Sequence, residues 1–122
     1  MDRVEEFVRE GKSFIYVDLS GLKTMEDFSR QFDLVKPVIS KYPELSLYSI
    51  TNIANTRFNP KIRGLILDYL KHNKRYVKYS VIIGIDGIKK LMIDTLIKLS
   101  GRDNISCAFC KENAIEWALR QG

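Results

Sequence analysis

The chain has 122 residues and a formal net charge of +5, with 20 lysines and arginines against 15 aspartates and glutamates. This length suits one compact domain, because domains usually run about 100 to 150 residues. Hydrophobic residues make up 45% of the chain and charged residues 29%, with 7 glycines and 3 prolines. These proportions exclude collagen-like and disordered chains, so we expect a single domain over residues 1–122.

The sequence shows no feature of export or membrane insertion. Its longest uninterrupted apolar stretch runs from Val81 to Ile85, far short of the roughly 18 residues that a spanning helix requires. Acidic residues stand at the start, where a signal peptide carries basic ones. Two cysteines are too few to staple a secreted domain. We therefore expect a cytoplasmic protein.

The positive charge is concentrated in residues 57–78, which contain seven basic residues and the single acid Asp68, with tyrosines interleaved. Such a segment suits phosphate groups and the stacking of bases. A solvated helix surface carries similar charges for solubility, however. We favour the solvated surface and do not expect nucleic-acid binding.

A short helix is predicted at the start of the chain, over residues 2–10. Val4, Phe7 and Val8 follow helical spacing there, and Gly11 suits the left-handed residue that closes a helix. We expect this helix to cover one end of the core.

Four strands come next, each indicated by a run of apolar or β-branched residues. The first is almost free of charge, which is typical of a parallel strand buried on both faces. In the second, which starts at Leu45, alternate side chains should face opposite sides of the sheet. The predicted strands span residues 13–19, 45–53, 77–85 and 105–109.

Each strand is followed by a predicted helix. Thr24 suits the N-cap of the first, which Pro37 should kink or divide. Asn59 before Pro60 opens the second, and Gly101 closes the third. Apolar spacing predicts these inward rows: Met25, Phe28, Phe32, Val35, Ile39 and Tyr42; Ile62, Leu65, Ile66, Tyr69 and Leu70; Ile88, Leu91, Met92, Thr95, Leu96 and Leu99; and Ala114, Trp117 and Ala118 within residues 111–120.

The alternation of strand and helix predicts an α/β fold, a four-stranded, mostly parallel sheet with helices on both faces. Leu67, Ile93 and Ile97 fall outside the predicted inward rows. Surplus apolar residues can mark a surface for a protein partner or a second copy of the chain, although single exposed aliphatic residues are ordinary. Self-association stays open at this point.

Polar residues follow the strands at the sheet edge where ligands of open α/β sheets collect. We expect a partner-binding or switch loop formed by Asp18, Ser20, Asn52, Asn55 and Thr56. An aspartate there could also serve acid–base chemistry or hold magnesium together with the aspartate of the third strand's turn. Nothing in the spacing of the two requires it.

The turn after the third strand is a possible anion site, formed by Gly84, Asp86, Gly87, Lys89 and Lys90. Two lysines in the first turn of a helix oppose the helix dipole, and a bound phosphate or carboxylate would relieve this. In the alternative interpretation, the glycines permit a tight turn and the aspartate caps the helix. The spacing matches neither common phosphate-loop motif.

The remaining reactive residues predict neither redox, metal nor hydrolytic chemistry. Cys107 and Cys110 form a CxxC pattern, but the first falls inside a predicted strand instead of at a helix start, so we expect one core thiol and one capping thiol. His72 has no serine or second histidine placed to pair with it. We expect no metal, no cofactor and no enzyme activity.

Several segments in a fixed order resemble a known family. They are residues 14–22 (Phe-Ile-Tyr-Val-Asp-Leu-Ser-Gly-Leu), 49–58, 72–78, 81–90, 99–102 and 114–117. Together they resemble a bacterial and archaeal family of small STAS-like domains, which is related to the anti-sigma-factor antagonists and described as SpoIIAA-like or STAS/SEC14-like. The resemblance implies a parallel-rich sheet flanked by helices.

The resemblance also implies a role without catalysis. In the antagonists, a phosphorylatable residue follows an aspartate in the loop before the second main helix. Residues 51–56 lack that Asp-Ser-Gly core, and Thr56 is the nearest acceptor. We expect a STAS-like module for protein–protein interaction or regulation. The alternative, suggested by the SEC14 side of the resemblance, is a carrier or sensor of a lipid or small anionic ligand at the turn that contains Lys89 and Lys90.

Overall fold

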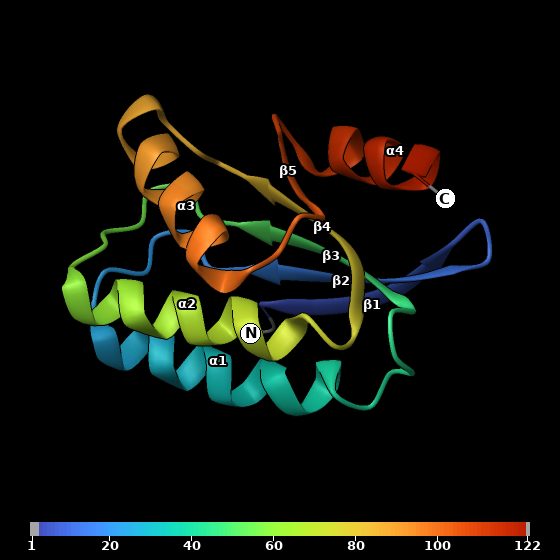
Figure 1. Cartoon of the computed structure of the whole chain (residues 1–122), viewed down its shortest axis with the longest axis horizontal. Helices are drawn as coiled ribbons and strands as arrows, with labels where there is room; N and C mark the ends of the chain where they lie inside the picture. Colours follow the sequence, from blue (N-terminus) through green and yellow to red (C-terminus); the bar gives the residue numbers. More distant parts are fainter. Residues whose placement is uncertain (1–2, 122) are drawn as a thin grey trace.

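The structure, a computed structural model, describes residues 3–121 as one mixed sheet flanked by helices (Figure 1). The sheet has five strands in the order β1-β2-β3-β4-β5. The elements in chain order are β1 (Val4–Arg9), β2 (Lys12–Asp18), α1 (Met25–Ile39), β3 (Leu47–Asn52), α2 (Pro60–Asn73), β4 (Val77–Ile83), α3 (Gly87–Ser100), β5 (Ile105–Ala108) and α4 (Lys111–Gln121).

The predicted alternation of parallel strands and helices is confirmed from β2 to α4. β2, β3, β4 and β5 pair in parallel, each with its neighbour in the sequence. Thr24, Asn59 and Asp86 cap the first three helices by accepting backbone N–H groups. Sequence patterning thus predicted the type and order of these elements, because strand and helix periods differ.

The predicted N-terminal helix is wrong, and its replacement by a strand makes the sheet five-stranded instead of four-stranded. Residues 4–9 form β1, which pairs antiparallel with β2 and places Phe7 opposite Phe14. The turn uses Glu10 and Gly11 at φ values of 52° and 77°. A helix of about nine residues is marginal in water, whereas the open edge of β2 offers the same residues a ladder of backbone hydrogen bonds.

Two smaller expectations also change. Pro37 lies in the last turn of α1, which continues to Ile39, so it does not divide the predicted helix. Leu45 lies outside β3, is exposed and has a φ of 52°. The strand therefore begins at Leu47, later than its apolar pattern suggested.

Helices cover the two faces of the sheet unequally. Figure 1 shows α1, α2 and α3 on one face and α4 alone on the other. The larger core fills the space under the three helices and includes Ile15, Val17, Phe28 and Phe32. The smaller core joins the other face to Ala114, Ile115 and Ala118 of α4. Helices on both faces are therefore confirmed, with most of the buried apolar side chains on the three-helix side.

An aromatic row crosses four strands on the α4 face. Phe7, Phe14, Tyr48 and Tyr79 are opposite one another in successive strand pairs. Neighbouring ring centroids are 5.2, 5.2 and 6.0 Å apart, and Trp117 of α4 meets the last ring edge-on at 5.9 Å. Cross-strand aromatic pairs stabilise a sheet, so this row covers a part of the face that one helix leaves open.

The inward face of α3 differs from the predicted one. Ile93, Leu96 and Ser100 are its buried residues, whereas Leu91 is 77% exposed. Ile88 and Leu99, also predicted inward, are 90% and 60% exposed. The helix carries apolar residues on nearly every side, so periodicity alone did not decide which side packs. The docking of α3 against α2 and the sheet decides it.

This orientation of α3 predicts unequal costs for two similar truncations. Ile93→Ala should lower the free energy of unfolding by about 2–5 kcal/mol, because it leaves a cavity in the core. Leu91→Ala should change the free energy of unfolding of the monomer by no more than about 0.5 kcal/mol, as is usual for surface sites. Urea denaturation of the two variants measures both, and equal losses would contradict this orientation.

Candidate functional site

The loops after β2, β3 and β4 meet at one edge of the sheet. Backbone hydrogen bonds join them: Leu19 N–H donates to Asn52 O at 2.8 Å, Gly21 N–H to Ala54 O at 2.9 Å, and Ile53 N–H to Ile83 O at 3.0 Å. The sequence predicted this convergence, because the carboxyl ends of parallel strands share an edge. The predicted loop residues and the predicted anion turn are therefore neighbours.

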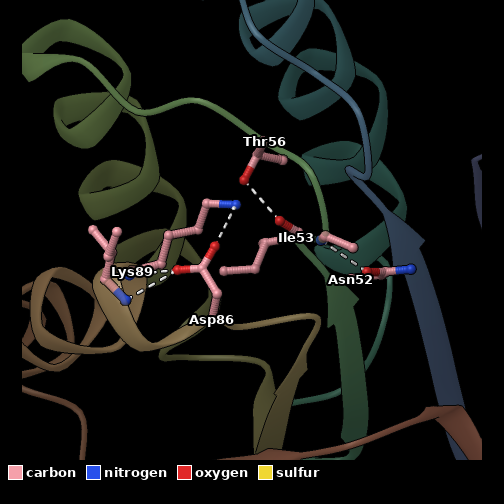
Figure 2. Close-up of polar contacts among 7 residues, drawn as sticks. Asn52, Ile53, Thr56, Asp86 and Lys89 are labelled. Atoms are coloured by element: carbon pink, nitrogen blue, oxygen red, sulfur yellow. Dashed lines mark hydrogen bonds and ion pairs between the residues drawn. The ribbon is translucent and has the colours of Figure 1, made fainter.

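The β3–α2 loop is held by its own polar side chains (Figure 2). Asn52 Oδ1 accepts from Ala54 N–H at 3.0 Å, and Asn52 Nδ2 donates to the Tyr16 hydroxyl at 3.2 Å. The Thr56 hydroxyl donates to Ile53 O at 2.7 Å, and Thr56 is only 5% exposed. In this conformation Thr56 closes the loop and lies out of reach of a modifying enzyme. Asn55 is exposed at the loop tip.

The β2–α1 loop is fastened from the N-terminal segment. Asp18 Oδ1 accepts from Ser20 N–H at 2.9 Å. Arg3 donates through Nη1 to Asp18 O at 3.1 Å and to Ser20 O at 2.7 Å. No sequence pattern indicated this role of Arg3, because it depends on the pairing of β1 with β2.

Gly84 permits the close approach of two loops. Its φ is +82°, and a Cβ at this position would lie 2.6 Å from Ala54 N and 2.9 Å from Ala54 Cα. Backbone atoms cannot move aside as a flexible side chain can, so a larger residue would push the β3–α2 loop away from β4. The tight turn is thus the observed role of this glycine.

Asp86 occupies the position at the start of α3 where an external anion was expected (Figure 2). Its Oδ1 accepts from Ile88 N–H at 3.1 Å and from Lys89 N–H at 2.9 Å. The backbone hydrogen bond from Lys89 is the main reason that the pKa of Asp86 lies below its usual value. The capping alternative therefore describes this turn, since the carboxylate already meets the positive end of the helix.

Both lysines of the predicted anion site have internal partners. Lys89 Nζ lies 3.6 Å from Asp86 Oδ2 and 6.0 Å from the centre of the Phe58 ring, and only 13% of its side chain is exposed. Lys90 Nζ lies 2.8 Å from both carboxylate oxygens of Asp94, whose hydrogen bond raises the pKa of Lys90. Each ammonium group is thus already balanced by a carboxylate.

Cys107 lies beside the β4–α3 turn, where it lines a shallow pocket with Asp86, Gly87 and Lys90. Cys107 is exposed, so the predicted core thiol is wrong: β5 is an edge strand, and this residue belongs to neither core. Cys110 is exposed and its thiol donates to Asn113 Oδ1 at 3.2 Å. His72 lies near the opposite end of α2, with Nδ1 2.9 Å from Asn73 Oδ1. Over residues 3–121, no three His, Cys, Asp or Glu side chains are grouped to hold a metal ion.

An exposed apolar surface lies beside the loops. We define the α3 face as Ile88, Leu91, Thr95 and Leu99, which recur at steps of three and four along one side of the helix. A shallow groove of about 470 Å³ runs along it, bordered by Arg63 of α2. The sequence predicted these residues as a row but placed them inside the core, so the surface was missed.

The comparisons with known proteins identify the fold. The chain has a SpoIIAA-like, STAS-like α/β fold, as the resemblance implied. It is similar to the crystal structure of an uncharacterized protein of the DUF3478 family with a SpoIIAA-like fold from Shewanella loihica PV-4, with a TM-score of 0.70 and 11% sequence identity. The match covers 93% of this chain and 90% of that one.

The sequence comparisons found no further relative of this chain. No protein-family model matches the chain, and no curated protein matches it. Within residues 3–121, no helix has the length and apolar character needed to cross a membrane.

The packing at Gly84 predicts opposite effects of one substitution at two glycines. Gly84→Ala should lower the free energy of unfolding by more than about 1 kcal/mol, because it combines a positive φ with a backbone clash. Gly64→Ala is the matched control: a Cβ in the middle of α2 meets no atom, so it should be neutral or stabilise by up to about 1 kcal/mol. Thermal denaturation of both variants tests this, and equal behaviour would rule out the close approach.

Proposed function

We propose that this chain is a non-enzymatic STAS-like module that acts by protein–protein contact, with the α3 face as its docking surface and a second copy of the chain as the simplest partner. The observation that carries the proposal is the row of large apolar side chains left in solvent along α3. Such a contiguous row is unfavourable in water unless something covers it.

The geometry of the row suits helix-to-helix docking. Its members span α3 from Ile88 to Leu99, about 16 Å at 1.5 Å per residue. The steps of three and four residues form the kind of ridge that packs against another helix. In a two-fold dimer, the same patch meets itself, so one apolar row is enough for a self-complementary interface.

The polar edge beside this face supports a role without catalysis. Asp18, Asn52, Thr56 and Asp86 each bond to backbone groups of their own loops. These hydrogen bonds fix the shape of the loops. At the next turn, Asp86, Gly87 and Lys90 line a shallow pocket of about 310 Å³, but the ammonium groups of Lys89 and Lys90 are already paired with carboxylates, so no free charge there favours an anionic ligand.

The proposal predicts that one charge on the α3 face separates the copies. The wild-type chain should sediment as a dimer at micromolar concentrations. Leu91→Asp should raise the dissociation constant of the dimer at least about tenfold, because burying a charge at an interface costs more than about 1.4 kcal/mol. Analytical ultracentrifugation measures this.

The matched control is Leu34→Asp, which adds the same charge to an exposed leucine of α1. It should leave the dimer intact. The proposed interface is wrong if the wild-type chain stays monomeric at about 100 times the micromolar concentrations of this experiment. It is also wrong if the two variants change the dissociation constant equally. Circular dichroism of each variant checks that the fold is retained.

A further inference from the structure

Arg102 places a charged group inside the protein, where the Asp103 carboxylate favours its charge without forming an ion pair with it. The residue lies after α3 in the loop to β5 and is only 6% exposed. Its Nη2 donates to the Ser80 hydroxyl at 2.8 Å and its Nε to Asn104 Oδ1 at 3.1 Å. Its Nη1 is buried and has no hydrogen-bond partner. None of the ion pairs found within residues 3–121 includes Arg102.

A buried guanidinium of this kind stays charged. Burial lowers the pKa of Arg102 to about 10, which still leaves it protonated at neutral pH. An uncompensated charge away from water is costly and is normally paired. The protein therefore has a positive interior position that favours an anion.

The unpartnered nitrogen belongs to a residue in the lining of a partly enclosed cavity between the sheet and the helices that cover it. Most of the surface of this cavity is apolar, and the small polar part comes from Ser49, Thr51, Tyr69, Asn73, Ser80 and Arg102. The cavity has a volume of about 30 Å³. Since about 10–15 Å³ is enough for one water molecule, this space accommodates a particle of water or halide size and excludes a phosphate ester.

Two buried groups in this lining can donate a hydrogen and have no acceptor at hydrogen-bonding geometry. The Tyr69 hydroxyl is buried beside Thr51, Asn73 and Arg102 and, like Arg102 Nη1, has no partner at full hydrogen-bonding geometry. Burial raises the pKa of Tyr69 to about 12, so the phenol keeps its proton. The Ser49 and Ser80 hydroxyls are 2.7 Å apart, and one shared hydrogen leaves the other to donate elsewhere.

From this arrangement we infer that the cavity is a binding site for a small monovalent anion of halide size, held by Arg102 Nη1 and the Tyr69 hydroxyl. An anion accepts from both groups and neutralises the guanidinium. A water molecule would satisfy the donors but would leave the charge unbalanced and would need acceptors for its own hydrogens.

A route to the site lies on the outer side of Arg102. The same residue lines a groove of about 510 Å³ together with Lys74, Lys78 and Asn104. Asp103 is the one acid in that lining. The positive side chains raise the local concentration of anions at the groove, and movement of the Arg102 side chain would open the cavity to it.

Bromide is the probe for the first experiment. The melting temperature of the wild-type chain is measured in sodium bromide and in sodium gluconate at equal ionic strength, because gluconate is too large for the cavity. Ligand binding to the folded state stabilises it, and we expect a saturable rise of about 3–5 °C with bromide. General salt effects oppose this result, since excluded, strongly hydrated anions stabilise proteins better.

Two variants and one control separate a bound ion from a structural effect. Arg102→Met should abolish the bromide-dependent rise whatever its own stability. Tyr69→Phe removes one hydroxyl but keeps the ring stacked at 4.4 Å on Phe32, so it should fold and reduce the rise at least about twofold. Arg57→Met, at an exposed arginine of the β3–α2 loop, should leave the rise unchanged.

A crystal grown in bromide gives the direct result. An anomalous peak within hydrogen-bond distance of Arg102 Nη1 would confirm the site. A cavity that holds only water, equal melting temperatures in bromide and gluconate, or an undiminished rise in Tyr69→Phe would each overturn it. None of these readouts depends on the oligomeric state or on the α3 face.

Discussion

The structure depends on one topological constraint, the sequential order of its parallel strands. β2, β3, β4 and β5 lie side by side in chain order, and a crossover between parallel strands is right-handed in nearly all proteins. Three crossovers in one direction place α1, α2 and α3 on the same face of the sheet, as Figure 1 shows. The other face is then left to α4, the helix that the chain forms after β5.

Because only one helix covers the second face of the sheet, other side chains complete the packing there. α4 has 11 residues and packs mainly on β3, β4 and β5. Nearer β1, the face is closed by the aromatic row and by Lys111, whose ammonium lies 5.2 Å from the centre of the Phe7 ring and 4.7 Å from that of Tyr16. Cations lie favourably over aromatic rings, so the start of α4 is tied to the hairpin. β1 completes this arrangement by adding Phe7.

The same constraint shapes the two surfaces of greatest interest. Three helices share one face, and α3 is the last of them, packed on α2 and with its outer side left in solvent. Its outward row is thus a consequence of where the crossover ends. The cavity at Arg102 lies under these helices, where α2, the sheet and the loop after α3 meet. Both features come from the stacking of elements and not from the polar loop residues that sequence motifs emphasised.

The sequence by itself determined the parallel strands, the helices between them, the caps at Thr24, Asn59 and Asp86, and the edge where polar loops meet. These depend on local periods and on hydrogen bonds within a few residues. Tertiary structure alone decided that residues 4–9 pair as a strand, which side of α3 is buried, and that Arg102 turns inward. Each of these depends on partners distant in the chain: β2 for residues 4–9, α2 and the sheet for α3, and Ser80 for Arg102. When several sides of a helix or strand are apolar, or when a charged side chain can point inward or outward, the local sequence does not decide which arrangement forms. The tertiary contacts with distant residues decide it.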